Sequence, residues 1–216
     1  MFKVALFDLD GVVFDTEPQY TEFWRSQCLL YHPDQPGLEQ RIKGQTLTQI
    51  YDKYFDGSLA CEREKITRRL DEFEQDMHFD YIAGFEAFIA DLRQHGVKTA
   101  VVTSSNQKKM DTVYRNHSEF RQMFDAILTA EDFDKSKPDP DCYLKGAQRF
   151  GATPDECVVF EDSFNGLKSG RAAEMVVVGL STTNPENEIS KFSDIVVNDY
   201  KSFKYENICN LITMFR

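Results

Sequence analysis

No apolar stretch of this 216-residue sequence is long enough to cross a lipid bilayer. The first apolar run, which begins at Phe2, is interrupted by Asp8 and Asp10, whereas the hydrophobic core of a secretory signal peptide is unbroken. We therefore expect no membrane partner and predict a cytoplasmic protein. The sequence also has no internal repeat and no glycine-rich linker, so its length fits one large domain or a core with a smaller module.

Basic residues and paired cysteines are also scarce. There are 25 lysines and arginines against 36 aspartates and glutamates, which gives a net charge of −11. Nucleic acids are bound through basic surfaces, so no nucleic-acid partner is expected. The five cysteines are odd in number and form no Cys-x-x-Cys pair, which argues against a disulfide framework or a thiolate zinc site. A monomer is consistent with these features.

Most of the sequence alternates between strand-like and helix-like patterns. Strands are predicted at residues 2–7, 97–102, 126–128, 157–160, 176–178 and 195–197, and helices at 85–95, 108–116, 139–150 and 164–173. Strands separated by helices are typical of an α/β fold with a parallel sheet and helices on both faces.

One segment, residues 15–81, lacks strand patterns and reads as helical throughout. A helix is predicted at 17–30 with Thr16 as its N-cap, and Thr46 with Gln49 has capping-box spacing before another helix. A further helix is predicted from apolar residues at helical spacing, namely Ile66, Leu70, Phe73 and Met77. We therefore predict a helical unit, residues 15–81, inserted into a core of residues 1–14 and 82–216.

Polar residues follow four of the predicted strands. Asp8 and Asp10 follow the first strand, Thr103 and Ser104 the second, and Glu161 and Asp162 a later one, while Lys137 follows the third at a distance. Each group also has an ordinary explanation. The first two acids could form a turn before Gly11, and the threonine and serine could cap a helix. Lys137 could be a surface lysine, and the later pair of acids could cap the next helix. However, parallel strands place their carboxyl ends at one sheet edge, where ligands bind. Together they favour a phosphate and metal site.

In this order and spacing the motifs resemble those of the haloacid dehalogenase-like superfamily, and within it the beta-phosphoglucomutase-like group. The opening Asp8-Leu9-Asp10-Gly11-Val12-Val13-Phe14-Asp15-Thr16-Glu17 is similar to the first motif of that group, and Glu161-Asp162-Ser163-Phe164-Asn165-Gly166 to the fourth. Thr103-Ser104 and Lys137-Pro138-Asp139 resemble the second and third. The resemblance implies a Rossmann-like core, a mobile helical cap, Mg²⁺ and an aspartyl-phosphate intermediate.

The resemblance also implies a role for each residue. Asp8 would be the nucleophile and Asp10 the general acid and base, while Thr103, Ser104 and Lys137 would bind the transferred phosphoryl group. Mg²⁺ would be held by Asp8, Asp162, the Asp10 carbonyl and, directly or through water, Glu161. A dehalogenase expels halide, which needs no proton, so a second acid at Asp10 favours phosphoryl transfer.

Three functions remain open at this point. The first is a phosphatase of a small phosphorylated metabolite such as a sugar phosphate, and the second is a hexose phosphate mutase. The third, an inactive phosphate-binding regulatory protein, is disfavoured because every motif residue is present.

The mutase cap carries Lys-Gly followed by an arginine for a second phosphate. Here Lys43-Gly44 is present but Leu47 stands at the place of the arginine, and Tyr20 replaces a histidine. Other basic residues of the segment could supply the charge instead, namely Arg41, Lys43, Arg68 and Arg69. We therefore predict a phosphatase, with Tyr20, Lys43 and Gly44 as candidate substrate contacts.

Overall fold

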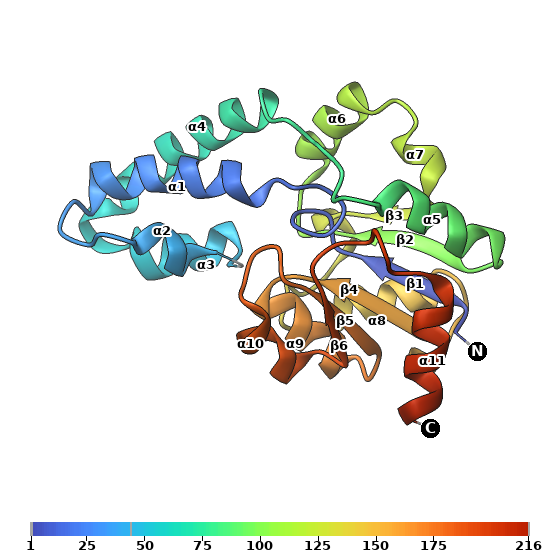
Figure 1. Ribbon diagram of the computed structural model, residues 1–216. Coiled ribbons are helices and arrows are strands. Elements are labelled where there is room, and N and C mark those ends of the chain that lie inside the picture. Colours follow the sequence, from blue (N-terminus) through green and yellow to red (C-terminus); the bar gives the residue numbers. More distant parts are fainter. Residues whose placement is uncertain (1, 44, 216) are drawn as a thin grey trace.

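The structure is a computed structural model, and it describes residues 2–43 and 45–215 of the chain. Six parallel strands form one sheet in the order β3-β2-β1-β4-β5-β6 (Figure 1). They are β1 (Val4–Phe7), β2 (Lys98–Val102), β3 (Ala126–Leu128), β4 (Cys157–Glu161), β5 (Val176–Leu180) and β6 (Ile195–Val197). The predicted α/β fold with a parallel sheet is therefore confirmed.

Side chains of β1 alternate between the two faces of the sheet, as strand geometry requires. Ala5 and Phe7 pack into a core that includes side chains from α5 (Phe85–Gln94), α6 (Gln107–Asn116), α7 (Phe120–Met123) and α11 (Tyr205–Phe215). Val4 and Leu6 pack on the other face, against α8 (Asp141–Gln148), α9 (Phe164–Ala172) and α10 (Glu186–Ile189). The first strand is buried on both sides, which fits its central position in the sheet.

The helical region inserted after β1 has its own apolar core. It contains α1 (Glu17–Tyr31), α2 (Leu38–Ile42), α3 (Leu47–Tyr54), a 3-10 helix η1 (Gly57–Glu62) and α4 (Arg63–Gln75), which lie beside the sheet rather than on it (Figure 1). Phe23, Trp24 and Phe55 are among its buried residues. The predicted capping box is present at α3, where Thr46 and Gln49 each accept a hydrogen bond from the other's backbone amide.

Two details of this region differ from the sequence-based predictions. The prediction that Met77 continues the helix of Ile66, Leu70 and Phe73 is wrong, because α4 ends at Gln75 and Met77 packs into the main core beside the sheet. Thr16 does occupy the N-cap position of α1, but its side chain makes no capping hydrogen bond. It donates instead to Asp10, which lies in the loop after β1.

Two short crossings join this helical region to the rest of the chain. Backbone hydrogen bonds connect them, with the Asp15 amide donating to Asp80 at 2.8 Å and the Ile82 amide donating to Val13 at 2.9 Å. Phe14 stacks on Tyr81, with ring centroids 4.8 Å apart. Within the described part of the chain, no helix combines the length and apolar character needed to span a membrane.

Candidate active site

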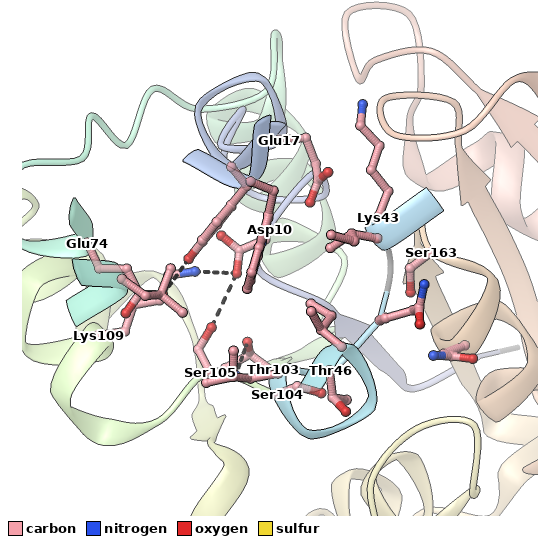
Figure 2. A pocket seen from close by; sticks show the side chains of 18 of the residues that line it. Asp10, Glu17, Lys43, Thr46, Glu74, Thr103, Ser104, Ser105, Lys109 and Ser163 are labelled. Carbon is pink, nitrogen blue, oxygen red and sulfur yellow. Dashed lines mark hydrogen bonds and ion pairs between the residues drawn. The ribbon is translucent and has the colours of Figure 1, made fainter. Parts of the chain in front are cut away.

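The four sequence motifs meet at one cleft between the helical insertion, which comprises α1 to α4, and the carboxyl ends of the strands. The cleft has a volume of about 420 Å³. Its lining includes the predicted site residues Asp8, Asp10, Tyr20, Lys43, Thr103, Ser104, Lys137 and Asp162. Figure 2 labels four of them, namely Asp10, Lys43, Thr103 and Ser104. Glu161 lies beneath it and is fully buried. Gly44 lies outside the described residues.

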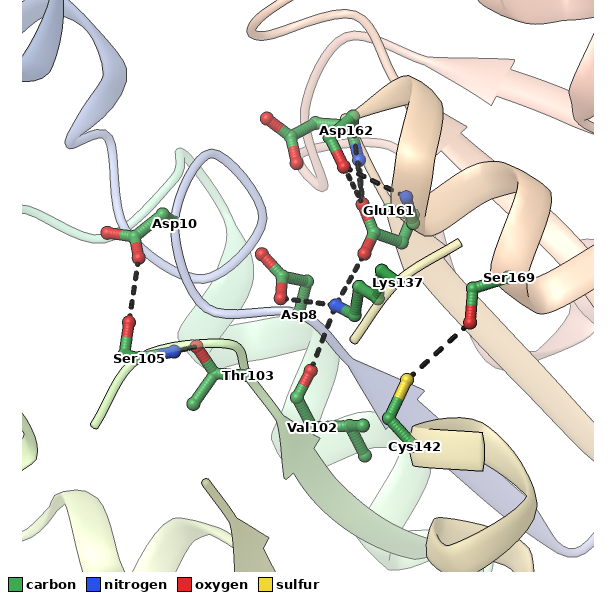
Figure 3. A network of polar contacts seen from close by, with 12 residues as sticks. Asp8, Asp10, Val102, Thr103, Ser105, Lys137, Cys142, Glu161, Asp162 and Ser169 are labelled. Atoms are coloured by element: carbon green, nitrogen blue, oxygen red, sulfur yellow. Dashed lines mark hydrogen bonds and ion pairs between the residues drawn. The ribbon is translucent and has the colours of Figure 1, made fainter. Parts of the chain in front are cut away.

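Lys137 connects the ends of three strands (Figure 3). Its Nζ atom donates to Asp8 Oδ1 and to Glu161 Oε1, both at 2.6 Å, and to the Val102 carbonyl oxygen at 3.2 Å. Only 5% of Lys137 is exposed, so it is not an ordinary surface lysine. It therefore brings a buried positive charge to the place where β1, β2 and β4 end.

Glu161 is held in place by five donors. Oε1 accepts from Lys137 and from Tyr143 Oη at 2.8 Å, and Oε2 accepts from the Asp162 amide, the Ser163 amide and Ser163 Oγ, each at 3.1 Å. The turn that follows leaves no room for a side chain at Gly166, where a Cβ atom would lie 1.7 Å from Glu161 Oε1. The sequence Glu161-Asp162-Ser163-Phe164-Asn165-Gly166 thus fixes the orientation of the first carboxylate.

Three carboxylates converge beside Lys137, namely Asp8, Glu161 and Asp162, with one oxygen of each within 4.8 Å of the others. Burial raises the pKa of Asp8 to about 7, and Lys137 opposes that rise. Burial also raises the pKa of Asp162, as does the nearby charge of Glu161. A single lysine among three buried acids leaves the group short of positive charge. Because all the candidate metal ligands in this cluster are carboxylate oxygens, the cluster fits a hard divalent cation such as Mg²⁺.

Asp10 stands apart from this cluster and has its own partners. Oδ1 accepts from Thr16 Oγ1 at 2.6 Å, while Oδ2 accepts from Ser105 Oγ at 3.2 Å and from Lys109 Nζ at 2.5 Å (Figures 2 and 3). Lys109 is 4% exposed, although it lies in the first turn of α6. Sequence reasoning missed Lys109 because nothing in its neighbourhood distinguishes it from a solvated helix residue.

The loop after β2 lines the cleft and also begins the next helix. Thr103 is buried and its Oγ1 accepts from the Ser105 amide at 3.0 Å, while Ser104 is exposed to the cleft. Asn106 is the N-cap of α6, its side chain accepting from the Lys109 amide. The helix cap is therefore Asn106, which leaves Thr103 and Ser104 at the cleft, where their phosphate-binding role stays a prediction.

The wall contributed by the helical insertion is more acidic than the sequence motifs suggested. Glu17 and Glu74 line the cleft together with Tyr20, whose hydroxyl donates to Glu74 at 2.8 Å. Burial raises the pKa of Glu17 to about 7, assisted by Asp10, while Lys43 opposes the rise. Among the described residues that line the cleft, Lys43 is the only cation from this wall, and Leu47 lies there too.

Comparison with known proteins agrees with this geometry. The family model for haloacid dehalogenase-like hydrolases matches residues 5–180. The fructose-1-phosphate phosphatase YqaB of Escherichia coli strain K12 is 29% identical over 80% of this chain and 93% of its own. The bifunctional riboflavin kinase/FMN phosphatase of Arabidopsis thaliana is 26% identical over 94% of this chain, which spans about half (54%) of that protein.

Among solved structures, a HAD hydrolase of family IA, variant 3, from Entamoeba histolytica has the same fold. Its TM-score is 0.83 at 20% identity, with 98% of this chain and 100% of that chain covered. The family match extends from β1 through β5 and includes all four motifs, as well as the inserted helices. The chain therefore belongs to the haloacid dehalogenase-like hydrolase family, and its fold carries a helical insertion after the first strand.

Proposed function

We propose that this protein is a Mg²⁺-dependent phosphatase that removes phosphate from a small metabolite through an aspartyl-phosphate on Asp8. The observation that supports this most strongly is the separation of two carboxylates in one cleft. Asp8 is paired with Lys137 among acids suited to a metal, and Asp10 is held separately by Lys109, Ser105 and Thr16. A nucleophile and an acid/base group require such different surroundings.

In the first half of the reaction, an Asp8 oxygen attacks phosphorus while the ester P–O bond breaks. Asp8 Oδ2 accepts no hydrogen bond from the described residues, so it is the oxygen free to attack. The leaving oxygen takes a proton from Asp10. In the second half, Asp10 removes a proton from water, which attacks phosphorus and releases phosphate from Asp8. Lys137, Thr103 and the Ser104 amide would bind the oxygens of the transferred group.

The carboxylates of Asp8 and Asp162 and the Asp10 carbonyl would hold Mg²⁺. Both oxygens of Glu161 are already occupied by donors, so we expect Glu161 to act on the ion through water. A bound Mg²⁺ would offset the negative charge of Asp8 and of the phosphate, which otherwise repel each other.

The acidic wall of the cleft supports an uncharged, hydroxyl-bearing leaving group. The Glu17 carboxylate accepts no hydrogen bond from another described residue and lies at the cleft near Lys43 (Figure 2). Carboxylates accept hydrogen bonds from sugar hydroxyls but repel a second anionic group. A relative that acts on fructose 1-phosphate is consistent with this class of substrate. We therefore propose a sugar or polyol monophosphate.

The second candidate, a hexose phosphate mutase, is favoured by one observation. Lys43 lines the cleft, where its charge opposes the rise in the pKa of Glu17, and its ammonium group could instead face a second phosphate. However, Leu47 also lines the cleft where the mutase arginine is expected, and none of the other candidate arginines does, namely Arg41, Arg68 and Arg69. One lysine is a weak substitute for a bidentate arginine.

Phosphate release from a panel of sugar, polyol and carboxylate-bearing phosphoesters in Mg²⁺ tests the phosphatase proposal, with Asp8→Asn as the inactive control. We expect phosphate release from the esters whose leaving alcohol is uncharged, and much less from 3-phosphoglycerate, whose leaving group carries a carboxylate. A parallel assay supplies beta-glucose 1-phosphate with a trace of glucose 1,6-bisphosphate. Glucose 6-phosphate forming much faster than free phosphate would favour the mutase and contradict our proposal.

A further inference from the structure

Lys109 is a buried lysine at a helix position that is unfavourable for a cation. It is the third residue of α6, and the amide hydrogen bond from Lys109 to the Asn106 side chain fixes the start of that helix. The N-terminus of a helix carries a partial positive charge, so a lysine there is repelled. Burial of 96% of the residue adds a desolvation cost, since 4% is exposed. Specific partners must offset both effects.

The main partner is Asp10. Lys109 Nζ lies 2.5 Å from Asp10 Oδ2, and the side chains are 3% and 19% exposed, respectively. Ser105 donates to the same oxygen and Thr16 to the other, so all three donors together restrict rotation of the carboxylate. Lys109 is the only charged group among these three. It therefore contributes most of the force that orients Asp10.

The opposite side of Lys109 is covered by the helical insertion. The Tyr20 ring lies over its ammonium group, with Nζ 4.7 Å from the ring centroid, and the Tyr20 hydroxyl is held by Glu74 of α4. The neighbouring Lys108 bonds to Asp71 of α4 at 2.6 Å, which joins α6 of the core to the insertion. Lys109 is thus enclosed by both parts of the molecule, which meet along α4 and α6 (Figures 1 and 2).

We propose that Lys109 is a positioning residue that holds Asp10 toward the leaving oxygen, and that its hold is complete only while the helical insertion covers it. The inference rests on the proposed function, in which Asp10 is the acid and base. An ion pair shielded from water is stronger than the same pair in solvent, so withdrawal of Tyr20 would loosen Asp10. Closure over a substrate and placement of the acid/base group are then one event.

The experiment measures release of the leaving group in the first turnover, with enzyme in excess and Mg²⁺ present. The probes are para-nitrophenyl phosphate, whose leaving group needs no proton, and three alkyl esters: fructose 1-phosphate, glucose 6-phosphate and glycerol 3-phosphate. We expect Lys109→Met to slow the alkyl esters about tenfold or more beyond its effect on the aryl ester, because only they need Asp10 as an acid. Lys109→Arg should restore most of the rate.

Lys98→Met is the matched control, since Lys98 pairs with Asp125 within the core, at 2.7 Å, and not with Asp10 or the insertion. It should leave the ratio of alkyl to aryl rates unchanged. In an Asp10→Asn background, Lys109→Met should cause no further loss on alkyl esters, because a residue that acts through Asp10 has nothing left to position. Equal slowing of both ester types, or the same loss with and without Asp10, would overturn the inference.

Two further measurements keep the outcome interpretable. If Lys109→Met does not fold, Tyr20→Leu removes the cover while leaving the ion pair, and should also lower alkyl rates more than aryl rates. An unchanged ratio in that variant would count against the dependence on closure. If the unaltered protein releases phosphate from none of the four esters, the proposed function itself is refuted and this inference falls with it.

Discussion

Replacing Lys137 by methionine should destabilise the metal-free protein strongly. The Lys137 side chain is 6% exposed and its Nζ lies 2.6 Å from both Asp8 and Glu161, whose side chains are 14% and 0% exposed. Methionine would fill similar space but leave both carboxylates without their cation. Removing one partner of a buried ion pair costs about 3–5 kcal/mol, so we expect a loss of that size in the free energy of unfolding.

Lys108→Met provides a control at the same distance from its acid. Lys108 Nζ also lies 2.6 Å from a carboxylate, that of Asp71, but the two side chains are 56% and 31% exposed. Exposed pairs contribute about 0–1 kcal/mol because water screens them. The contrast between the two variants therefore isolates the effect of burial from the effect of distance.

The pH dependence of the Lys137→Met loss follows from the pKa of Asp8. Burial raises that pKa to about 7 while Lys137 opposes the rise, so removing Lys137 should raise it further. The folded variant then binds more protons than the unfolded chain, and its stability falls as pH rises. Urea unfolding in chelator should show a larger loss at about pH 8 than at about pH 5.5. A loss below about 1 kcal/mol at both pH values, or a larger one in acid, would refute the reasoning.

Three further predictions concern the site and the insertion. Asp8→Asn should abolish turnover at a nearly unchanged melting temperature, and activity close to that of the unaltered protein would contradict its role as nucleophile. Activity should require Mg²⁺ and be inhibited by Ca²⁺, which prefers looser coordination, and equal activity in Ca²⁺ or after chelation would count against this. Mg²⁺ affinity should rise with pH, because protons compete with the metal for Asp8. Amide hydrogen exchange at residues 14–16 and 81–84 should slow when Mg²⁺ and trifluoromagnesate are added, since closure shields the intermediate; unchanged exchange would indicate a fixed insertion.

The residues at the strand ends were predictable because topology constrains them. Asp8, Thr103 and Glu161 each follow or end a buried strand, and parallel strands bring those ends to one edge of the sheet. Lys137 follows the third strand at a greater distance, but it belongs to the same ordered set of motifs. Local patterns of apolar residues were therefore sufficient to predict the sheet and to bring four segments together.

Contacts between the helical insertion and the core were not predictable in the same way. Lys109, Tyr20 and Glu74 come from three different helices, and their meeting depends on how α4 lies against α6. No periodicity in a single sequence encodes that arrangement. The prediction that Met77 belongs to the helix was wrong for a related reason. Its helical spacing from Phe73 does not indicate where the chain leaves α4 to rejoin the core.

The two carboxylates to which we assign catalytic roles differ in how fully the protein itself satisfies them. Asp10 has one lysine of its own and two hydroxyl donors, so its orientation is set by the chain alone. Asp8 shares Lys137 with Glu161 and lies next to Asp162, which leaves three acids facing one buried cation. A buried cluster with that balance either takes up protons or binds a metal. In the proposed mechanism the nucleophile is therefore the group that would gain most from a bound metal, whereas the acid/base group would rely on Lys109 and on the insertion that covers it.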